Sequence, residues 1–161
     1  MRGGVLPPAL LCAAVGLALA FAPRRAWLPS LVTLTTTTVV LAALPIPGEW
    51  LEGVFLGCWA SMAATAAAVH LPRGMTASGA VGLSFNAGLW SGAEVALAGS
   101  RPDIGKVLCC VLLLIPALFI VRRHAPIIVK VVASWLIAVA ILAATLQFLP
   151  VTPGYLPDHL D

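Results

Sequence analysis

Long apolar stretches follow one another along the chain, and the short segments between them hold nearly all of the charged residues. Within the stretches apolar and polar residues do not alternate, so a barrel of transmembrane strands is disfavoured. A helix needs about 20 apolar residues to cross the hydrocarbon of a bilayer, with about 17 to 25 tolerated. The pattern therefore predicts an all-α polytopic membrane protein, built as a bundle of six short transmembrane helices. Their expected ranges are 5–22, 27–44, 53–71, 77–99, 104–121 and 127–149.

The length of the chain fits a single domain. We expect the six-helix transmembrane domain to cover residues 1–149. A Pro-rich extracytoplasmic tail should cover residues 150–161, because its prolines and glycine cannot continue a helix. Near the start, Ala20-Phe21-Ala22 resembles the cleavage site of a signal peptide, but a proline and two arginines follow directly. We therefore expect the first segment to remain in the protein as a helix.

The overall composition points to the same class of protein. Of the 161 residues, 61% are hydrophobic and 9% are charged, and the mean hydropathy is +1.05. Soluble domains carry roughly 25% charged residues, and a soluble chain of this size could not cover so much apolar surface. The lipid bilayer must therefore act as part of the solvent. The net charge of +3 is small and dispersed, so no nucleic-acid partner is expected.

The distribution of Lys and Arg predicts the orientation, since these residues accumulate in cytoplasmic loops. The loops expected inside carry Arg24, Arg25, Arg73, Arg122, Arg123 and, just beyond, Lys130. The segments expected outside carry Arg2, Arg101 and Lys106, together with most of the acidic residues. Both termini are therefore predicted to be extracytoplasmic, in a protein of the bacterial inner membrane.

Small residues within the expected helices predict how the bundle holds together, because lipid leaves no hydrophobic force between helices. Gly53 and Gly57 form a G-x-x-x-G in the third helix, and Gly88 and Gly92 form another in the fourth. The threonines at 35–38 lie in the middle of the second helix, where each hydroxyl can bond the backbone one turn earlier. We expect these residues to serve helix packing.

The helix expected over 77–99 carries the most polar group of residues inside the membrane. At about 100° per residue, Asn86, Trp90 and Glu94 share one face, and Ser84, Gly88 and Ser91 share the opposite face. A carboxylate inside a membrane is costly and suggests a function by default. Glu94 could bind a proton or another cation, with Asn86 and Trp90 beside it. Lys106, near the outer end of the next helix, is the alternative partner, and the pair would then be a structural salt bridge.

The cysteines offer a weaker candidate site. Cys12, Cys58, Cys109 and Cys110 are expected at a similar depth, and Met62 lies one turn from Cys58. Thiolate and thioether ligands suit Cu(I) or another thiophilic metal. However, free Cys is also a common small apolar filler, and no C-x-x-C is present. We therefore favour a packing role over metal or redox chemistry, and the sequence indicates no particular cofactor.

Three functional hypotheses remain open, and we rank them as follows. The first is a non-enzymatic accessory or assembly subunit of an inner-membrane complex, with other membrane subunits or a second copy of the chain as partners. The second is a small transporter or channel for an ion or small solute that uses Glu94. The third is a membrane redox or metal-binding protein. An enzyme is disfavoured, because the chain has no nucleophile, zinc-protease, phosphate-loop or dinucleotide motif.

Overall fold

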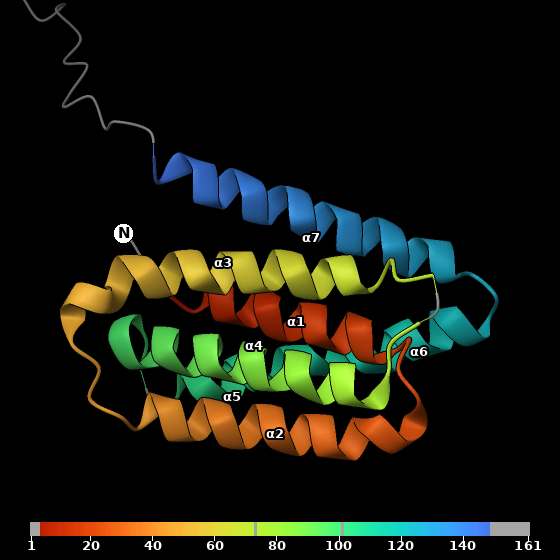
Figure 1. The fold of residues 1–161 in the computed structure, drawn as a ribbon, viewed down its shortest axis with the longest axis horizontal. Helices are drawn as coiled ribbons and strands as arrows, with labels where there is room; N and C mark the ends of the chain where they lie inside the picture. The colour runs from red at the N-terminus through yellow and green to blue at the C-terminus, as the bar shows by residue number, and fades with distance from the viewer. Residues whose placement is uncertain (1–3, 73, 101, 149–161) are drawn as a thin grey trace, which may run out of the picture.

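A computed structural model describes residues 4–72, 74–100 and 102–148, and over these residues the chain is helical and contains no strand (Figure 1). The α-helices are α1 (Leu6–Leu19), α2 (Arg24–Ala42), α3 (Leu51–Ala68), α4 (Ala77–Ala98), α5 (Asp103–Cys109), α6 (Leu114–Arg122) and α7 (Pro126–Leu146). Two short 3-10 segments are η1 (Gly48–Trp50), which leads into α3, and η2 (Cys110–Leu113), which joins α5 to α6.

Because α5, η2 and α6 follow one another without a gap, the described chain forms six helical rods. Each rod lies within a few residues of a range predicted from the apolar stretches, so the all-α class and the count of helices are confirmed. Prolines and a threonine mark where several of the helices begin. Pro7 stands in the first turn of α1, and Thr76 caps α4 by accepting a hydrogen bond from the Gly79 backbone N–H at 3.1 Å. The predicted tail over 150–161 lies outside the described residues.

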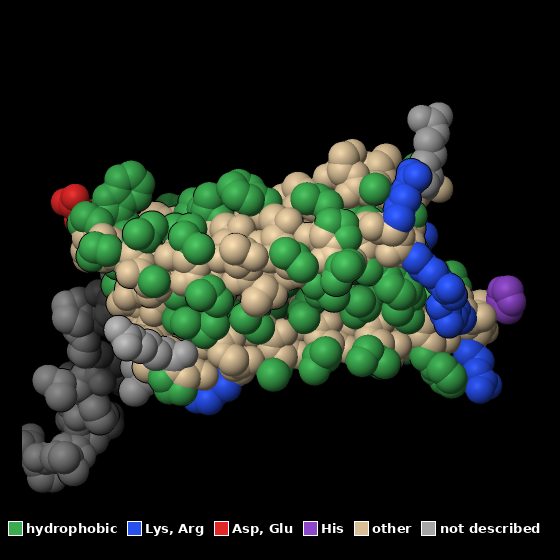
Figure 2. Space-filling model, turned by 90° about the horizontal axis from the view of Figure 1, so that it is seen from below, with side chains coloured by type: hydrophobic (Ala, Val, Ile, Leu, Met, Phe, Trp, Pro, Cys, Tyr) green, Lys and Arg blue, Asp and Glu red, His purple; other side chains and the backbone are tan. Residues whose placement is uncertain are grey.

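Successive rods run in opposite directions, so α1 begins and α7 ends at the same end of the bundle (Figure 1). The connections α1–α2, α3–α4 and α6–α7 lie at the other end, which we call the basic end. Its described cationic residues are Arg24, Arg25, Arg122, Arg123 and Lys130. Figure 2 shows most of the Lys and Arg side chains of that view gathered at one end, with a largely apolar surface along the bundle.

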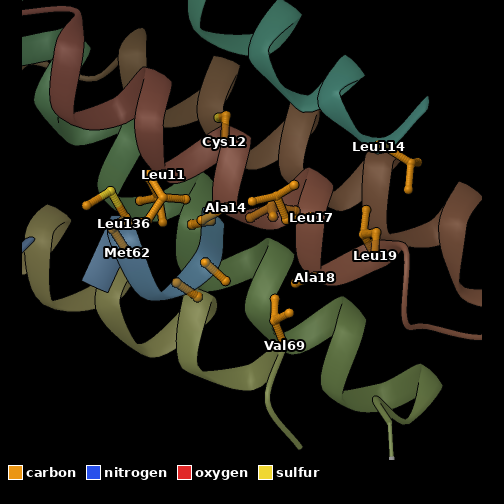
Figure 3. Packing of buried hydrophobic residues seen from close by; sticks show 14 of the residues in the cluster. Leu11, Cys12, Ala14, Leu17, Ala18, Leu19, Met62, Val69, Leu114 and Leu136 are labelled. Carbon is orange, nitrogen blue, oxygen red and sulfur yellow. The ribbon is translucent and has the colours of Figure 1, made fainter. Parts of the chain in front are cut away.

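The shortest rod, α1, forms the centre of the bundle. Every residue from Leu11 to Leu19 is buried, and α1 packs against α3, α4, η2 and α6. In Figure 3 side chains of α1 lie among Met62, Val69, Leu114 and Leu136 from the surrounding helices. At 14 residues, α1 is about 21 Å long, which is shorter than the roughly 30 Å of a bilayer's hydrocarbon core.

The closest pair of rods is α2 and α4, which pack through small residues. A Cβ built on Gly92 would come within 2.7 Å of the Thr38 carbonyl oxygen, and one on Gly88 within 2.9 Å of the Leu34 carbonyl oxygen. The backbones of the two helices therefore approach too closely for any side chain at these two positions. Of the threonine run, Thr38 is fully buried, whereas Thr36 is exposed and donates its hydroxyl hydrogen to the Val32 carbonyl at 2.6 Å.

The fifth rod is interrupted at η2, just before Pro116. Proline lacks the N–H that would bond the carbonyl four residues earlier, and its ring displaces that carbonyl, so the preceding turn tightens. The expected break at Pro116 is thus present, as a 3-10 turn. The turn also accommodates α1, because a Cβ on Gly16 would lie only 2.7 Å from the Val111 carbonyl oxygen.

Three segments of the described chain are long and apolar enough to cross a membrane: Gly48–Ala68, Asp103–Arg122 and Pro126–Leu146. These segments give the chain the character of a membrane protein. The other three rods do not combine this length with this hydropathy. The first, α1, is short and central, while α2 and α4 carry more polar residues and pack on each other. Six membrane spans therefore stay a prediction.

Candidate functional site

Glu94 is the most unusual buried residue of the described chain. It lies near the C-terminal end of α4, its side chain is 0% exposed, and neither carboxyl oxygen has a hydrogen-bond partner within residues 4–72, 74–100 and 102–148. Within the described chain, the backbone amide of Gly4 lies near the carboxyl group. Burial of an unpartnered ionised carboxylate is very costly, so a group in this position calls for a ligand.

The surroundings of Glu94 come from α1, α3 and α4, the three helices that meet at the core of the bundle. Cys58 on α3 lies within electrostatic range of Glu94 and of Cys12 on α1. The Cys12 thiol in turn contacts the Ser91 hydroxyl, with 3.8 Å between Sγ and Oγ. The carboxyl group is therefore enclosed by weakly polar groups and apolar side chains.

Asn86 and Trp90, the other members of the predicted stripe, form a hydrogen-bonded chain that does not include Glu94. The Trp90 indole N–H donates to Asn86 Oδ1 at 3.1 Å, and the Asn86 amide donates to the Ser61 hydroxyl across the α3–α4 contact. The Trp90 ring lies directly over Gly57 of α3. These two hydrogen bonds give the polar groups their partners and hold α3 against α4.

Lys106 does not pair with Glu94. Its ammonium group donates instead to Asp103 one turn earlier on α5, with 2.8 Å between Nζ and Oδ1, and the Lys106 side chain is 68% exposed. The Asp103 carboxylate also accepts from the Ser100 backbone N–H at 2.9 Å. The salt bridge considered from the sequence is therefore absent from this structure. Local spacing decided the outcome, because Asp103 lies three residues from Lys106 on the same helix.

The other cysteines and Met62 differ in burial. Cys58 and Met62 are buried in α3, Cys110 is half-buried in η2, and Cys109 is exposed. Within residues 4–72, 74–100 and 102–148, no group of three or more His, Cys, Asp or Glu side chains is arranged to hold a metal ion. Adjacent Cys109 and Cys110 point in different directions because successive helical residues are about 100° apart.

Among the four glycines expected at helix contacts, Gly57, Gly88 and Gly92 face a neighbouring helix so closely that a Cβ would clash, whereas a Cβ on Gly53 would meet nothing. Sequence reasoning did not identify Ser61 and Cys58 as neighbours of the polar residues of α4. A signal existed for Ser61, which follows Gly57 by one turn and so shares its face.

The geometry at Glu94 favours a proton over a larger cation. Metal cations need several converging acceptor atoms. The polar groups that the described residues bring near this carboxyl are the Cys58 thiol and the Gly4 backbone N–H, which is a donor. A proton needs only the carboxyl group itself. The arrangement can therefore take up and release one proton in an enclosed site.

Comparison with known proteins gives no further information: the chain matches no family model, no curated protein and no solved structure.

Proposed function

We propose that this protein is a small transporter or channel of the bacterial inner membrane, in which Glu94 binds and releases the transported or coupled proton. The observation that supports this function is the burial of Glu94, with neither carboxyl oxygen hydrogen-bonded to any residue that the structure describes. Ionisable residues within membrane bundles mark proton and ion pathways, because their cost is tolerated only where they have a use.

The proposed orientation places the basic end of the bundle in the cytoplasm and both termini outside. Five described Lys and Arg residues lie at the basic end, while among the described cationic residues only Lys106 lies toward the other end. The acidic residues Glu49, Glu52 and Asp103 share that other end with Lys106. This separation of charge supports the orientation, because positive residues accumulate on the cytoplasmic side. Glu94, three turns or more from the basic end of α4, would then lie nearer the outer boundary.

The test is proton flux into liposomes that contain the purified protein and a trapped pH-sensitive dye. We expect the wild-type protein to conduct or couple protons under an imposed pH gradient. Glu94→Gln keeps the shape of the side chain but cannot release a proton, so the flux should fall to the background of empty liposomes. Glu49→Gln is the matched control, since it removes an exposed carboxylate at the same end.

Flux through Glu94→Gln that equals the wild-type flux would contradict the proposal. Infrared difference spectra across a pH titration add a readout that does not depend on transport. As the pH falls, the carbonyl bands of protonated acids should appear in the wild type, and the spectrum of Glu94→Gln should lack one of these bands.

A second candidate is the accessory subunit of a larger complex, and α7 favours it. This helix packs mainly on α3, and it leaves Trp135, in its middle, 60% exposed. An indole N–H in the middle of a bilayer finds no acceptor in lipid, whereas a partner helix could supply one. Native mass spectrometry of the protein released from its own membrane decides between the two. Other chains retained in a fixed ratio would favour the accessory subunit, and a lone protein or homo-oligomer would favour the transporter.

A further inference from the structure

An open groove lies at the basic end of the bundle, between the start of α2 and the face of α6. It has a volume of about 380 Å³ and is lined by Trp27, Ile115, Leu118, Phe119 and Arg122. The groove exists because the helices on its two sides pack mainly against other helices. On one side α2 packs on α4, and on the other side α6 packs on α1. The lining is apolar along the helices and becomes cationic where α6 ends.

The walls of the groove are held in place by contacts of their own. The Trp27 indole N–H donates to the Leu19 carbonyl at 3.0 Å, which fixes the ring across the α1–α2 turn. On the opposite wall, the Arg123 guanidinium lies over the Phe119 ring, 4.6 Å from its centroid. A cation over an aromatic face is attracted by the ring. The Arg122 side chain thus lines the polar end of the groove, and the Arg123 guanidinium is held against Phe119, another residue of its lining.

Among the described residues, no acidic side chain lies at this end of the bundle. Arg24 and Arg25 open α2 just before Trp27, and both are exposed. In the part of the chain that the structure describes, the ion pair Lys106–Asp103 is at the opposite end, and the carboxylates of Glu49 and Glu52 lie there too. An anion at the mouth of the groove would therefore meet several arginines and, within the part of the chain that the structure describes, no competing acid.

We propose that this groove binds one anionic phospholipid of the cytoplasmic leaflet, with the phosphate on Arg122 and an acyl chain along Ile115 and Leu118. The groove combines a cationic mouth with an apolar floor on an outward-facing side of the bundle, which matches a lipid with a charged head and a hydrocarbon tail. Trp27 suits the boundary between the two, since amphipathic rings favour the membrane interface. The proposal rests on the proposed membrane orientation and is independent of proton binding at Glu94.

The experiment is native mass spectrometry of the full chain in detergent, titrated with dioleoylphosphatidylglycerol or with dioleoylphosphatidylcholine. We expect a first phosphatidylglycerol to bind well before a second and more tightly than phosphatidylcholine. Arg122→Gln should weaken that first binding step about five-fold, as expected for loss of one interfacial cation. Lys130→Gln is the matched control, because it removes the same charge from the same end but from α7, away from the groove. It should leave the first step unchanged.

A second variant tests the apolar part of the groove without changing any charge. Ile115, 65% exposed, can be replaced by Trp to fill the groove, and Ile115→Trp should weaken phosphatidylglycerol binding while thermal unfolding in lipid-free detergent stays as in the wild type. Should Ile115→Trp fail to fold, Arg122→Gln and Lys130→Gln still test the proposal. Equal weakening by these two variants would overturn it, because attraction would then be diffuse. Displacement of the lipid by soluble glycerol 3-phosphate would also overturn it, because the site would then bind a free phosphate.

Discussion

The indole ring of Trp90 on α4 lies directly over Gly57 on α3, in the space that a side chain at position 57 would need. The ring cannot easily turn away, because its N–H donates to Asn86, which in turn donates to Ser61 of α3. One small residue and one large residue therefore fit together at the contact, and the polar groups around them are satisfied. Since α3 and α4 also flank Glu94, the contact helps to fix the surroundings of the buried carboxyl.

Replacement of Gly57 by Ala should destabilise the bundle. The new Cβ would collide with the Trp90 ring, and overpacking of this kind costs about 1–3 kcal/mol, more than the gain in helix propensity of about 1 kcal/mol. Gly53→Ala is the matched control from the same helix, where the new Cβ would meet nothing, so it should be neutral or stabilising. Unfolding in mixed detergent micelles measures both changes. Equal stability of the two variants would show that Trp90 does not constrain position 57.

Replacement of Gly92 by Ala should separate α2 from α4. The nearest atoms to its new Cβ are the Leu41 Cβ at 2.6 Å and the Thr38 carbonyl oxygen at 2.7 Å. A backbone atom cannot move aside without a shift of the helix, so we expect a loss of stability toward the upper part of the range of about 1–3 kcal/mol for overpacking. Gly82→Ala, at an open position of α4, provides the comparison. Cross-linking between cysteines introduced on α2 and α4 should decrease in Gly92→Ala alone, and unchanged cross-linking would contradict the close approach.

Asn86 should stabilise the contact between α3 and α4, and it should not carry protons. Asn86→Leu leaves the Ser61 hydroxyl and the Trp90 N–H without their partners, and each unpartnered buried group costs about 1–3 kcal/mol. A double-mutant cycle with Trp90→Phe, which removes the five-membered ring that carries the N–H, should therefore give a clear coupling energy in unfolding experiments. Any Glu94-dependent proton flux per folded molecule should be unchanged in Asn86→Leu. Loss of flux at full stability would instead place Asn86 on the pathway.

The sequence by itself determined the helices of this protein. The ranges of the apolar stretches and the prolines at their edges predicted all six rods to within a few residues, because hydrophobic length and helix breakers act locally. Spacing along one helix likewise placed Asn86 one turn from Trp90, where the two side chains are hydrogen-bonded, and predicted that Pro116 disturbs its rod. These inferences need only the geometry of a single helix.

The tertiary structure decided which helices meet and what each polar residue finds there. It placed Ser61 beside Asn86 and paired Lys106 with Asp103. It also buried Glu94 without a hydrogen-bond partner among the described residues, and it placed the short, apolar α1 at the centre of the bundle. Sequence could not fix these pairings, because six apolar rods with similar small-residue faces can pack in many orders with little difference in hydrophobic burial. The choice depends on the close fit of particular atoms, such as Gly92 against the Thr38 carbonyl, and that fit exists only once the chain has folded.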